Sequence, residues 1–239
     1  VSFRYPGAGA DTLRGISFSA RPGEMIGVIG GTGAGKTSLA NLIPRFYDVT
    51  GGAVLLNGAD VRTLQLQSLR AQIGVVPQKA LLFSGTIREN LHWGNADAAD
   101  DALWDALKAA QADGVVRDKP GGLDAAVETG GRNFSGGQRQ RLTIARALVR
   151  RPSLLILDDS ASALDFATDA ALRKALRSLP WRPTVLLISQ RISSIRHADQ
   201  ILVLDDGRLA GIGTHETLLA SCPVYQEICR SQLKKEDAE

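Results

Sequence analysis

One glycine-rich stretch restricts the possible folds of this chain more than any other part of its sequence. Residues 30–37 read Gly-Gly-Thr-Gly-Ala-Gly-Lys-Thr. They fit the pattern G-x-x-x-x-G-K-[ST], in which glycines let the backbone turn so tightly that its N–H groups face bound phosphates. A hydrophobic segment at residues 24–29 precedes the stretch, and residues 36–43 have a helical pattern that stops near Pro44. A strand, a phosphate-binding loop and a helix in this order predict an α/β nucleotide-binding fold.

The loop contains most of the residues that we expect to hold a nucleotide. Lys36 is expected to neutralise β- and γ-phosphate oxygens, and the hydroxyl of Thr37 is expected to bind Mg²⁺. A chance glycine-rich turn is the alternative, and the preceding strand and following helix argue against it. We predict nucleotide contacts from Gly30, Thr32, Gly33, Ala34, Gly35, Lys36, Thr37 and Ser38.

A second feature suited to Mg²⁺ lies at the end of a hydrophobic segment. Residues 154–157 read Leu-Leu-Ile-Leu, and Asp158 and Asp159 follow them directly. A carboxylate at the end of such a buried strand can reach a nucleotide-bound Mg²⁺. Many strands end in acidic residues, so this feature alone is weak evidence. Together with the loop at residues 30–37 it becomes strong evidence for a Mg²⁺ site. We assign Asp158 to Mg²⁺.

Strand and helix patterns alternate over much of the chain. Such alternation favours a mostly parallel sheet with helices on its faces. The opening of the chain and the segment near residue 55 have short strand patterns, whereas residues 86–116 are helical and alanine-rich. The expected strands are 1–5, 13–20, 24–29, 52–57, 73–76, 154–157, 184–188 and 200–204, and the expected helices include 36–43, 138–150 and 167–179.

Composition excludes two classes of protein. The 28 basic and 25 acidic residues leave a net charge of only +3 without a clustered basic stripe, so we expect no nucleic-acid partner. No apolar run approaches the roughly 18–20 residues that span a bilayer, so we do not expect this chain to cross a membrane by itself.

The most specific motif is Phe-Ser-Gly-Gly-Gln-Arg-Gln-Arg at residues 134–141. Ser135 followed by a helix also describes an ordinary helix N-cap, so this segment by itself leaves both interpretations open. The order of motifs is more informative, and it runs through residues 30–37, Gln78, residues 134–141, Asp158 and the Ser-Gln-Arg at 189–191. In this order the chain resembles the ATP-binding cassette (ABC) proteins over essentially its whole length, and residues 134–141 resemble their signature motif.

The resemblance implies a fold and a division of the chain. The fold is α/β, a P-loop NTPase with a RecA-like core, an antiparallel β subdomain and an inserted α-helical subdomain. The core and the β subdomain are expected at residues 1–78 and 152–239, and the helical subdomain with the signature motif at residues 79–151.

The resemblance also implies ATP and Mg²⁺ as ligands, with roles for residues outside the loop. Tyr5 is expected to stack on adenine, although from the residues alone it is an ordinary strand aromatic. Gln78 is expected to complete the Mg²⁺ shell with Thr37 and Asp158. In the family two domains stack head to tail around ATP, so a second domain is the expected partner of the signature residues Ser135, Gly136, Gly137 and Gln138.

Two parts of the sequence are similar to ABC exporters rather than importers. One extends from residues 45–48 to residues 82–90, and the other is the Gly-Thr-His-Glu at residues 213–216. Closure of the paired domains drives the membrane domains of exporters between inward- and outward-facing states. The resemblance thus implies transmembrane domains as partners and a position at the cytoplasmic face of the plasma membrane. The exported substrate stays open.

Two positions depart from the family pattern. Asp159 stands where the family has a Glu that polarises the attacking water, and the lost methylene shortens its reach by about 1.5 Å. A misplacement near 1 Å can lower a rate on the order of 10²-fold. Gln190 replaces a His that contacts the γ-phosphate, and an amide carries no positive charge. The candidate catalytic residues are therefore Lys36, Gln78, Asp158, Asp159 and Gln190.

Together the departures resemble the degenerate half of heterodimeric exporters. We expect tight ATP binding and slow hydrolysis at this chain's own site, with a partner chain that carries a complete catalytic site. A homodimer with two slow sites, and an ordinary domain that tolerates Asp159, are alternatives. A soluble ABC ATPase is a further alternative, but the short spacing between Lys36 and Ser135 leaves no room for the coiled coils of chromosome-maintenance members.

Overall fold

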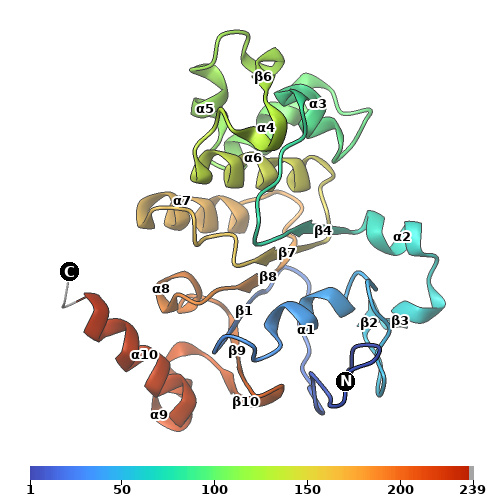
Figure 1. Ribbon diagram of the computed structural model, residues 1–239, viewed down its shortest axis with the longest axis vertical. Helices are drawn as coiled ribbons and strands as arrows, with labels where there is room; N and C mark the ends of the chain where they lie inside the picture. Colours follow the sequence, from blue (N-terminus) through green and yellow to red (C-terminus); the bar gives the residue numbers. More distant parts are fainter. Residues whose placement is uncertain (237–239) are drawn as a thin grey trace. The chain divides into compact units, whose positions relative to one another are not determined.

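The computed structural model describes residues 1–236, with side chains up to Gln232. The chain divides into two compact units (Figure 1). The first unit contains Val1–Ile73 and the chain from Thr184 onward, and the second contains Gly74–Pro183. The expected boundaries of a core and a helical subdomain stay a prediction.

The first unit is built on a mixed sheet with the strand order β10-β9-β1-β8. The central strand β1 (Met25–Gly30) is buried along its whole length and pairs in parallel with β8 (Thr184–Ile188) and β9 (Gln200–Asp205). Strand β10 (Arg208–Gly213) runs antiparallel to β9. A strand buried on both faces is expected to be uniformly apolar, as β1 is. Its carboxyl end leads directly into the predicted phosphate-binding loop.

Helices and a small hairpin complete the first unit. A Cβ on Gly27 of β1 would lie 3.0 Å from the Cβ of Ile195, so the short helix α8 (Ile192–Ile195) packs tightly on this strand. The hairpin consists of β2 (Leu55–Leu56) and β3 (Ala59–Asp60). The helices are α1 (Lys36–Leu42), η1 (Val61–Thr63), α2 (Leu66–Ala71), α8 (Ile192–Ile195), α9 (His215–Ser221) and α10 (Pro223–Glu236).

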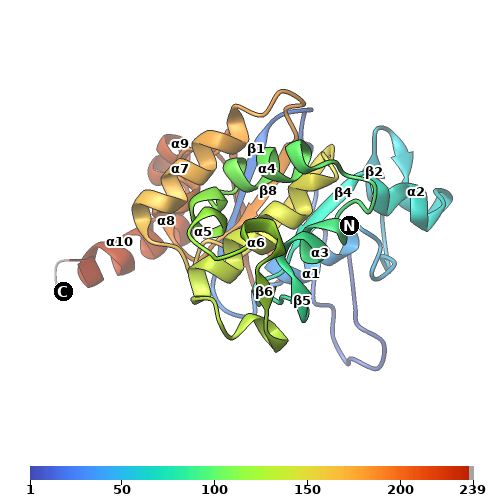
Figure 2. The same ribbon diagram turned by 90° about the horizontal axis from the view of Figure 1, so that it is seen from above.

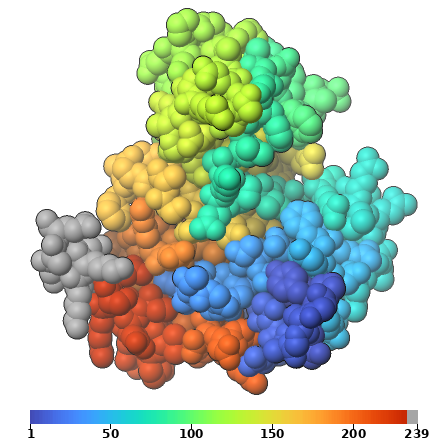
Figure 3. All heavy atoms as spheres, viewed as in Figure 1, coloured from blue at the N-terminus to red at the C-terminus, as the bar shows by residue number. Residues whose placement is uncertain are grey.

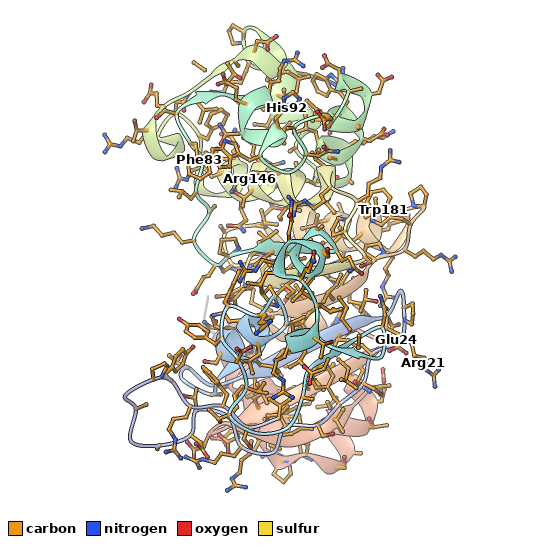
Figure 4. All side chains as sticks on the ribbon, turned by 90° about the vertical axis from the view of Figure 1, so that its right-hand side faces the viewer. Arg21, Glu24, Phe83, His92, Arg146 and Trp181 are labelled. Atoms are coloured by element: carbon orange, nitrogen blue, oxygen red, sulfur yellow. The ribbon has the colours of Figure 1, made fainter. Side chains whose placement is uncertain are left out.

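The second unit is mainly helical. Helix α6 (Gly136–Val149) packs beside α4 (Asp100–Ala109), as Figures 1 and 2 show. The guanidinium of Arg146 on α6 lies 5.4 Å from the ring centre of Phe83, and Figure 4 shows these two side chains together. The other elements are β4 (Ile73–Val76), β5 (Gly85–Thr86), α3 (Ile87–His92), α5 (Asp113–Arg117), η2 (Gly122–Asp124), β6 (Ala126–Val127), η3 (Thr129–Gly131), β7 (Leu154–Asp158) and α7 (Phe166–Arg177).

Side chains fix the starts of two helices in this unit. Thr86 and Glu89 form a reciprocal capping box at the start of α3. Asp165 accepts a hydrogen bond of 2.9 Å from the backbone N–H of Thr168 at the start of α7. This N–H, and then the Thr168 hydroxyl, hold the pKa of the Asp165 carboxyl below its usual range. These caps satisfy backbone donors that a helix leaves unpaired at its first turn.

The structure confirms the predicted α/β fold and corrects several predicted strands. Residues 1–5 and 13–20 are not regular strands, and only isolated bridges pair Ser2 with Gly51 and Phe3 with Leu13. Gly15 has a φ of 61°, which interrupts the second segment. Residues 52–57 contribute only the two-residue strand β2. The alternating pattern of these three segments indicates which side chains are buried, but it does not indicate a continuous ladder of backbone hydrogen bonds.

Other expectations agree with the structure more closely. The predicted segments 73–76 and 184–188 coincide with β4 and β8, and the predicted helix at 36–43 is α1. The helical region at 86–116 is divided into α3, α4 and α5. Strand β10, the two-residue strands β3, β5 and β6, and helices α2, α8, α9 and α10 were not predicted. No helix in the described part of the chain is both long enough and apolar enough to span a membrane.

Candidate functional site

The loop after β1 is shaped by close contacts that only glycine allows. A Cβ on Gly30 would collide with the carbonyl oxygen of Leu204 on β9. Gly35 has a φ of 95°, and a Cβ there would lie 2.6 Å from a methyl carbon of Leu13. Left-handed backbone and tight packing therefore both require glycine at Gly35. The two glycines at the ends of the loop fix its path, and residues 31–33 between them are exposed.

The polar side chains of this loop are arranged around its backbone. The ammonium of Lys36 donates hydrogen bonds to the carbonyl oxygens of Gly30, at 2.8 Å, and Gly31, at 2.7 Å. Thr37 is exposed at the start of α1, whereas Ser38 is buried. The Lys36 ammonium is therefore anchored over the loop, where a positive charge can attract phosphate oxygens.

Tyr5 lies close to this loop. The hydroxyls of Tyr5 and Ser38 share a hydrogen bond of 3.0 Å, although 33 positions separate them in the sequence. The rings of Phe3 and Tyr47 lie against the Tyr5 ring. Tyr5 and Tyr47 also line an open cavity of about 460 Å³. In Figure 3 the first residues of the chain, in dark blue, lie at the surface beside the segment around residue 50.

Gln190 follows β8 in the same unit and is exposed. The C-terminal helix α10 holds its backbone, because the amide of Gln232 donates to the carbonyl oxygen of Gln190 at 2.6 Å. The Gln232 side-chain oxygen accepts from the N–H of Ile192 at 2.9 Å. One side chain thus holds the backbone on both sides of Arg191. Gln232 was not predicted, since no local pattern in α10 indicates which segment it contacts.

The predicted acidic pair lies in the second unit, where β7 ends. Asp158 and Asp159 are 8% and 7% exposed, respectively. Asp159 has a φ of 46°, which is left-handed backbone that Asp and Asn adopt more readily than most residues. Its carboxylate accepts a hydrogen bond of 3.1 Å from the side-chain amide of Gln78. The structure therefore brings Gln78, predicted to bind Mg²⁺, to the position predicted to polarise water.

The signature residues form the start of α6 in the same unit. The Ser135 hydroxyl accepts from the N–H of Gln138 at 3.2 Å, and the Gln138 side chain accepts from the N–H of Ser135 at 2.9 Å. This is a reciprocal capping box, so the ordinary N-cap interpretation of Ser135 describes its local contacts. A Cβ on Gly137 would lie 3.0 Å from the carbonyl oxygen of Ala163, so the start of α6 approaches the segment before α7 closely.

Comparison with known proteins identifies the family. Residues 13–162 match the family described as ABC transporter.

The chain belongs to the ABC transporter family.

An uncharacterized ABC transporter ATP-binding protein of Mycobacterium tuberculosis is 49% identical over 97% of this chain and 40% of its own length. An ATP-dependent lipid A-core flippase of Syntrophus aciditrophicus is 41% identical over 99% of this chain and 39% of its own length. This ABC domain therefore spans about two fifths of the length of these relatives.

Solved structures support the same assignment. A bacterial Atm1-family ABC exporter with ATP bound has a TM-score of 0.92 and 38% sequence identity over 97% of this chain and 41% of that chain. The expected P-loop NTPase fold is thus shown. Domains of the ABC family bind ATP, typically with Mg²⁺, and the family hydrolyses ATP in general.

The residues of this ABC domain fit Mg²⁺ by their donor chemistry. A threonine hydroxyl, an amide oxygen and a carboxylate, offered by Thr37, Gln78 and Asp158, are the hard oxygen ligands that Mg²⁺ takes up together with phosphates. Asp158 is held at the end of a buried strand, which limits the orientations its carboxylate can adopt. The assignment of individual ligands stays a prediction.

Proposed function

We propose that this domain is the ATP-binding motor of an ABC exporter and that its own ATP site hydrolyses slowly. The observation that carries the proposal is the combination of a complete phosphate-binding loop with departures at Asp159 and Gln190. The proposed partners are transmembrane domains and a second ABC domain with a complete catalytic site. The proposed location is the cytoplasmic face of the plasma membrane.

The loop contacts support tight binding of ATP. In the proposed complex Lys36 moves its ammonium from loop carbonyls to the β- and γ-phosphate oxygens, and backbone N–H groups from Gly30 to Ser38 hold the remaining oxygens. Tyr5 stacks on adenine. Bound Mg²⁺ would neutralise phosphate charge, with Thr37, Gln78 and Asp158 as its proposed protein ligands.

The acidic strand end supports slow hydrolysis. Asp159 is short, buried and hydrogen-bonded to Gln78, so its carboxylate reaches less far than the Glu of the family pattern. Gln190 can orient a water or phosphate oxygen through its amide but contributes no charge. Both effects lower stabilisation of the transition state and leave the phosphate-binding loop unchanged.

The signature residues support pairing with a second domain. Ser135, Gly136 and Gly137 follow the family pattern, so we propose that they complete the ATP site of the partner chain. Proteins similar to this chain include one named as a lipid A-core flippase and a solved structure of an Atm1-family ABC exporter.

The first experiment measures ATP affinity and steady-state Mg-ATPase activity on the same sample of the 239-residue chain. We expect binding without appreciable turnover. Turnover is expected after addition of an ABC domain that has Glu at the position of Asp159 and His at the position of Gln190. Size-exclusion chromatography with ATP checks that the two chains associate. Robust turnover by this chain alone would contradict the slow-site proposal but not the assignment as an ATP-binding domain.

A further inference from the structure

Tyr5 belongs to an aromatic cluster that also contains Phe3 and Tyr47. The ring centres of Tyr5 and Tyr47 are 5.0 Å apart with their planes at 84°. Those of Tyr5 and Phe3 are 4.7 Å apart with their planes at 75°. Both are edge-to-face geometries, which aromatic pairs favour. Ser38 holds the Tyr5 hydroxyl, so the ring is held at three points by three segments of the first unit.

Phe3 and Tyr47 differ in what else they do. Phe3 is 1% exposed and belongs to the core, so its ring would be present whether or not Tyr5 had a ligand. Tyr47 is 40% exposed and lines the same cavity as Tyr5. Burial of the hydrophobic core therefore does not account for Tyr47, and its contacts with Phe3 and Tyr5 need another explanation.

The segment that carries Tyr47 is held in place by ionic contacts. Arg45 has a left-handed φ of 54°, and its guanidinium donates to the two carboxylate oxygens of Asp48 at 2.6 and 3.3 Å. The same guanidinium donates to the carbonyl oxygen of Arg62. Tyr47 lies between Arg45 and Asp48, so this ion pair closes a short loop around it.

A second arginine holds the start of this segment. The guanidinium of Arg70 donates to the carbonyl oxygens of Pro44, at 3.0 Å, and Arg45, at 2.9 Å. It also lies 5.2 Å from the ring centre of Phe46. Phe46 thus faces Arg70, whereas its neighbour Tyr47 faces Tyr5. Because these adjacent aromatic residues have separate partners, a substitution of Phe46 is a matched control for a substitution of Tyr47.

We propose that Tyr47 is a positioning residue for recognition of the purine base. It fixes the orientation of the Tyr5 ring for stacking on adenine and acts through Tyr5, not through the phosphates. The inference rests on the proposed role of Tyr5 as the stacking residue. Tyr47 is expected to affect the part of the affinity that depends on the base, because the contacts of the phosphate-binding loop lie elsewhere.

The test compares two ligands of the 239-residue chain, ATP and inorganic tripolyphosphate, by calorimetry. Loss of one aromatic pair is expected to weaken ATP binding about three- to tenfold in Tyr47→Leu, with tripolyphosphate binding unchanged within about twofold. Tyr47→Phe restores ATP affinity because it keeps the ring. Phe46→Leu, the matched control, leaves the ratio of the two affinities unchanged. Equal weakening of both ligands in Tyr47→Leu would overturn the proposal.

A double variant tests whether Tyr47 acts through Tyr5. Once Tyr5→Ala has removed the stacking ring, adding Tyr47→Leu should weaken ATP binding no further. Two losses that multiply would show a separate role for Tyr47 and overturn the inference. Unchanged ATP affinity in Tyr5→Ala would instead overturn the proposed role of Tyr5, so the two failures are distinguishable. Thermal melts check folding, and Tyr47→Gln replaces Tyr47→Leu if the latter does not fold.

Discussion

The phosphate-binding loop of the first unit and the acidic strand end of the second follow the family pattern to different degrees. In the loop every motif position is present, and close contacts at Gly30 and Gly35 fix its backbone. At the strand end Asp158 follows the pattern, but Asp159 is short, adopts left-handed backbone and accepts a hydrogen bond from Gln78. Asp159 and Gln190 are not among the residues predicted to bind ATP or Mg²⁺, so a domain with these departures can keep binding and lose much of its hydrolysis.

The largest expected effect is a gain of ATP hydrolysis when the two departing positions are returned to the family pattern. We expect Asp159→Glu combined with Gln190→His to raise ATP turnover in the assembled dimer by up to about 10²-fold, because the carboxylate regains reach and an imidazole at position 190 can carry positive charge. Steady-state phosphate release measures the gain.

A matched control for this gain is Asp159→Asn with Gln190→His. Asn has the same length as Asp and tolerates the left-handed backbone, but it cannot act as a base. No rate gain in the Glu variant, or an equal gain in the Asn variant, would show that these residues do not limit turnover.

The next largest effect concerns ATP binding by the phosphate-binding loop. We expect Lys36→Ala to weaken ATP binding about ten- to a hundredfold, because a charge-assisted contact with phosphate oxygens is lost. Calorimetric titration with ATP measures the loss. Lys36→Met keeps most of the side-chain length without the charge and should behave alike. ATP affinity maintained in Lys36→Met would mean that the ammonium does not contact the phosphates.

The smallest effect concerns the segment after β8. We expect Gln232→Leu to speed hydrogen exchange of the Ile192 amide about two- to tenfold, because that N–H loses its acceptor on α10. Exchange measured by mass spectrometry or NMR detects the change. Gln226→Leu is the control, since the Gln226 amide donates to Leu219 and lies on the same helix. Equal acceleration in both variants would indicate general loosening of α10.

Much of the fold could be predicted because its signals are local. The glycine-rich loop between a buried strand and a helix, and the strands at residues 73–76 and 184–188, follow from hydrophobic pattern and turn chemistry. The errors at residues 1–5, 13–20 and 52–57 have one cause. Alternating burial does not specify whether a strand finds a partner along its whole length, and Gly15 or Gly52 can bend the chain away.

The sequence by itself determined the order of the nucleotide-binding motifs, the class of fold and the two departures at Asp159 and Gln190. Only the tertiary structure decided which side chains meet, as in the pairs Tyr5–Ser38, Gln78–Asp159 and Gln190–Gln232. These partners lie 33, 81 and 42 positions apart, respectively. A local pattern indicates whether a residue lies in a helix, strand or turn, but contacts at such separations form only when distant segments of the same unit fold together.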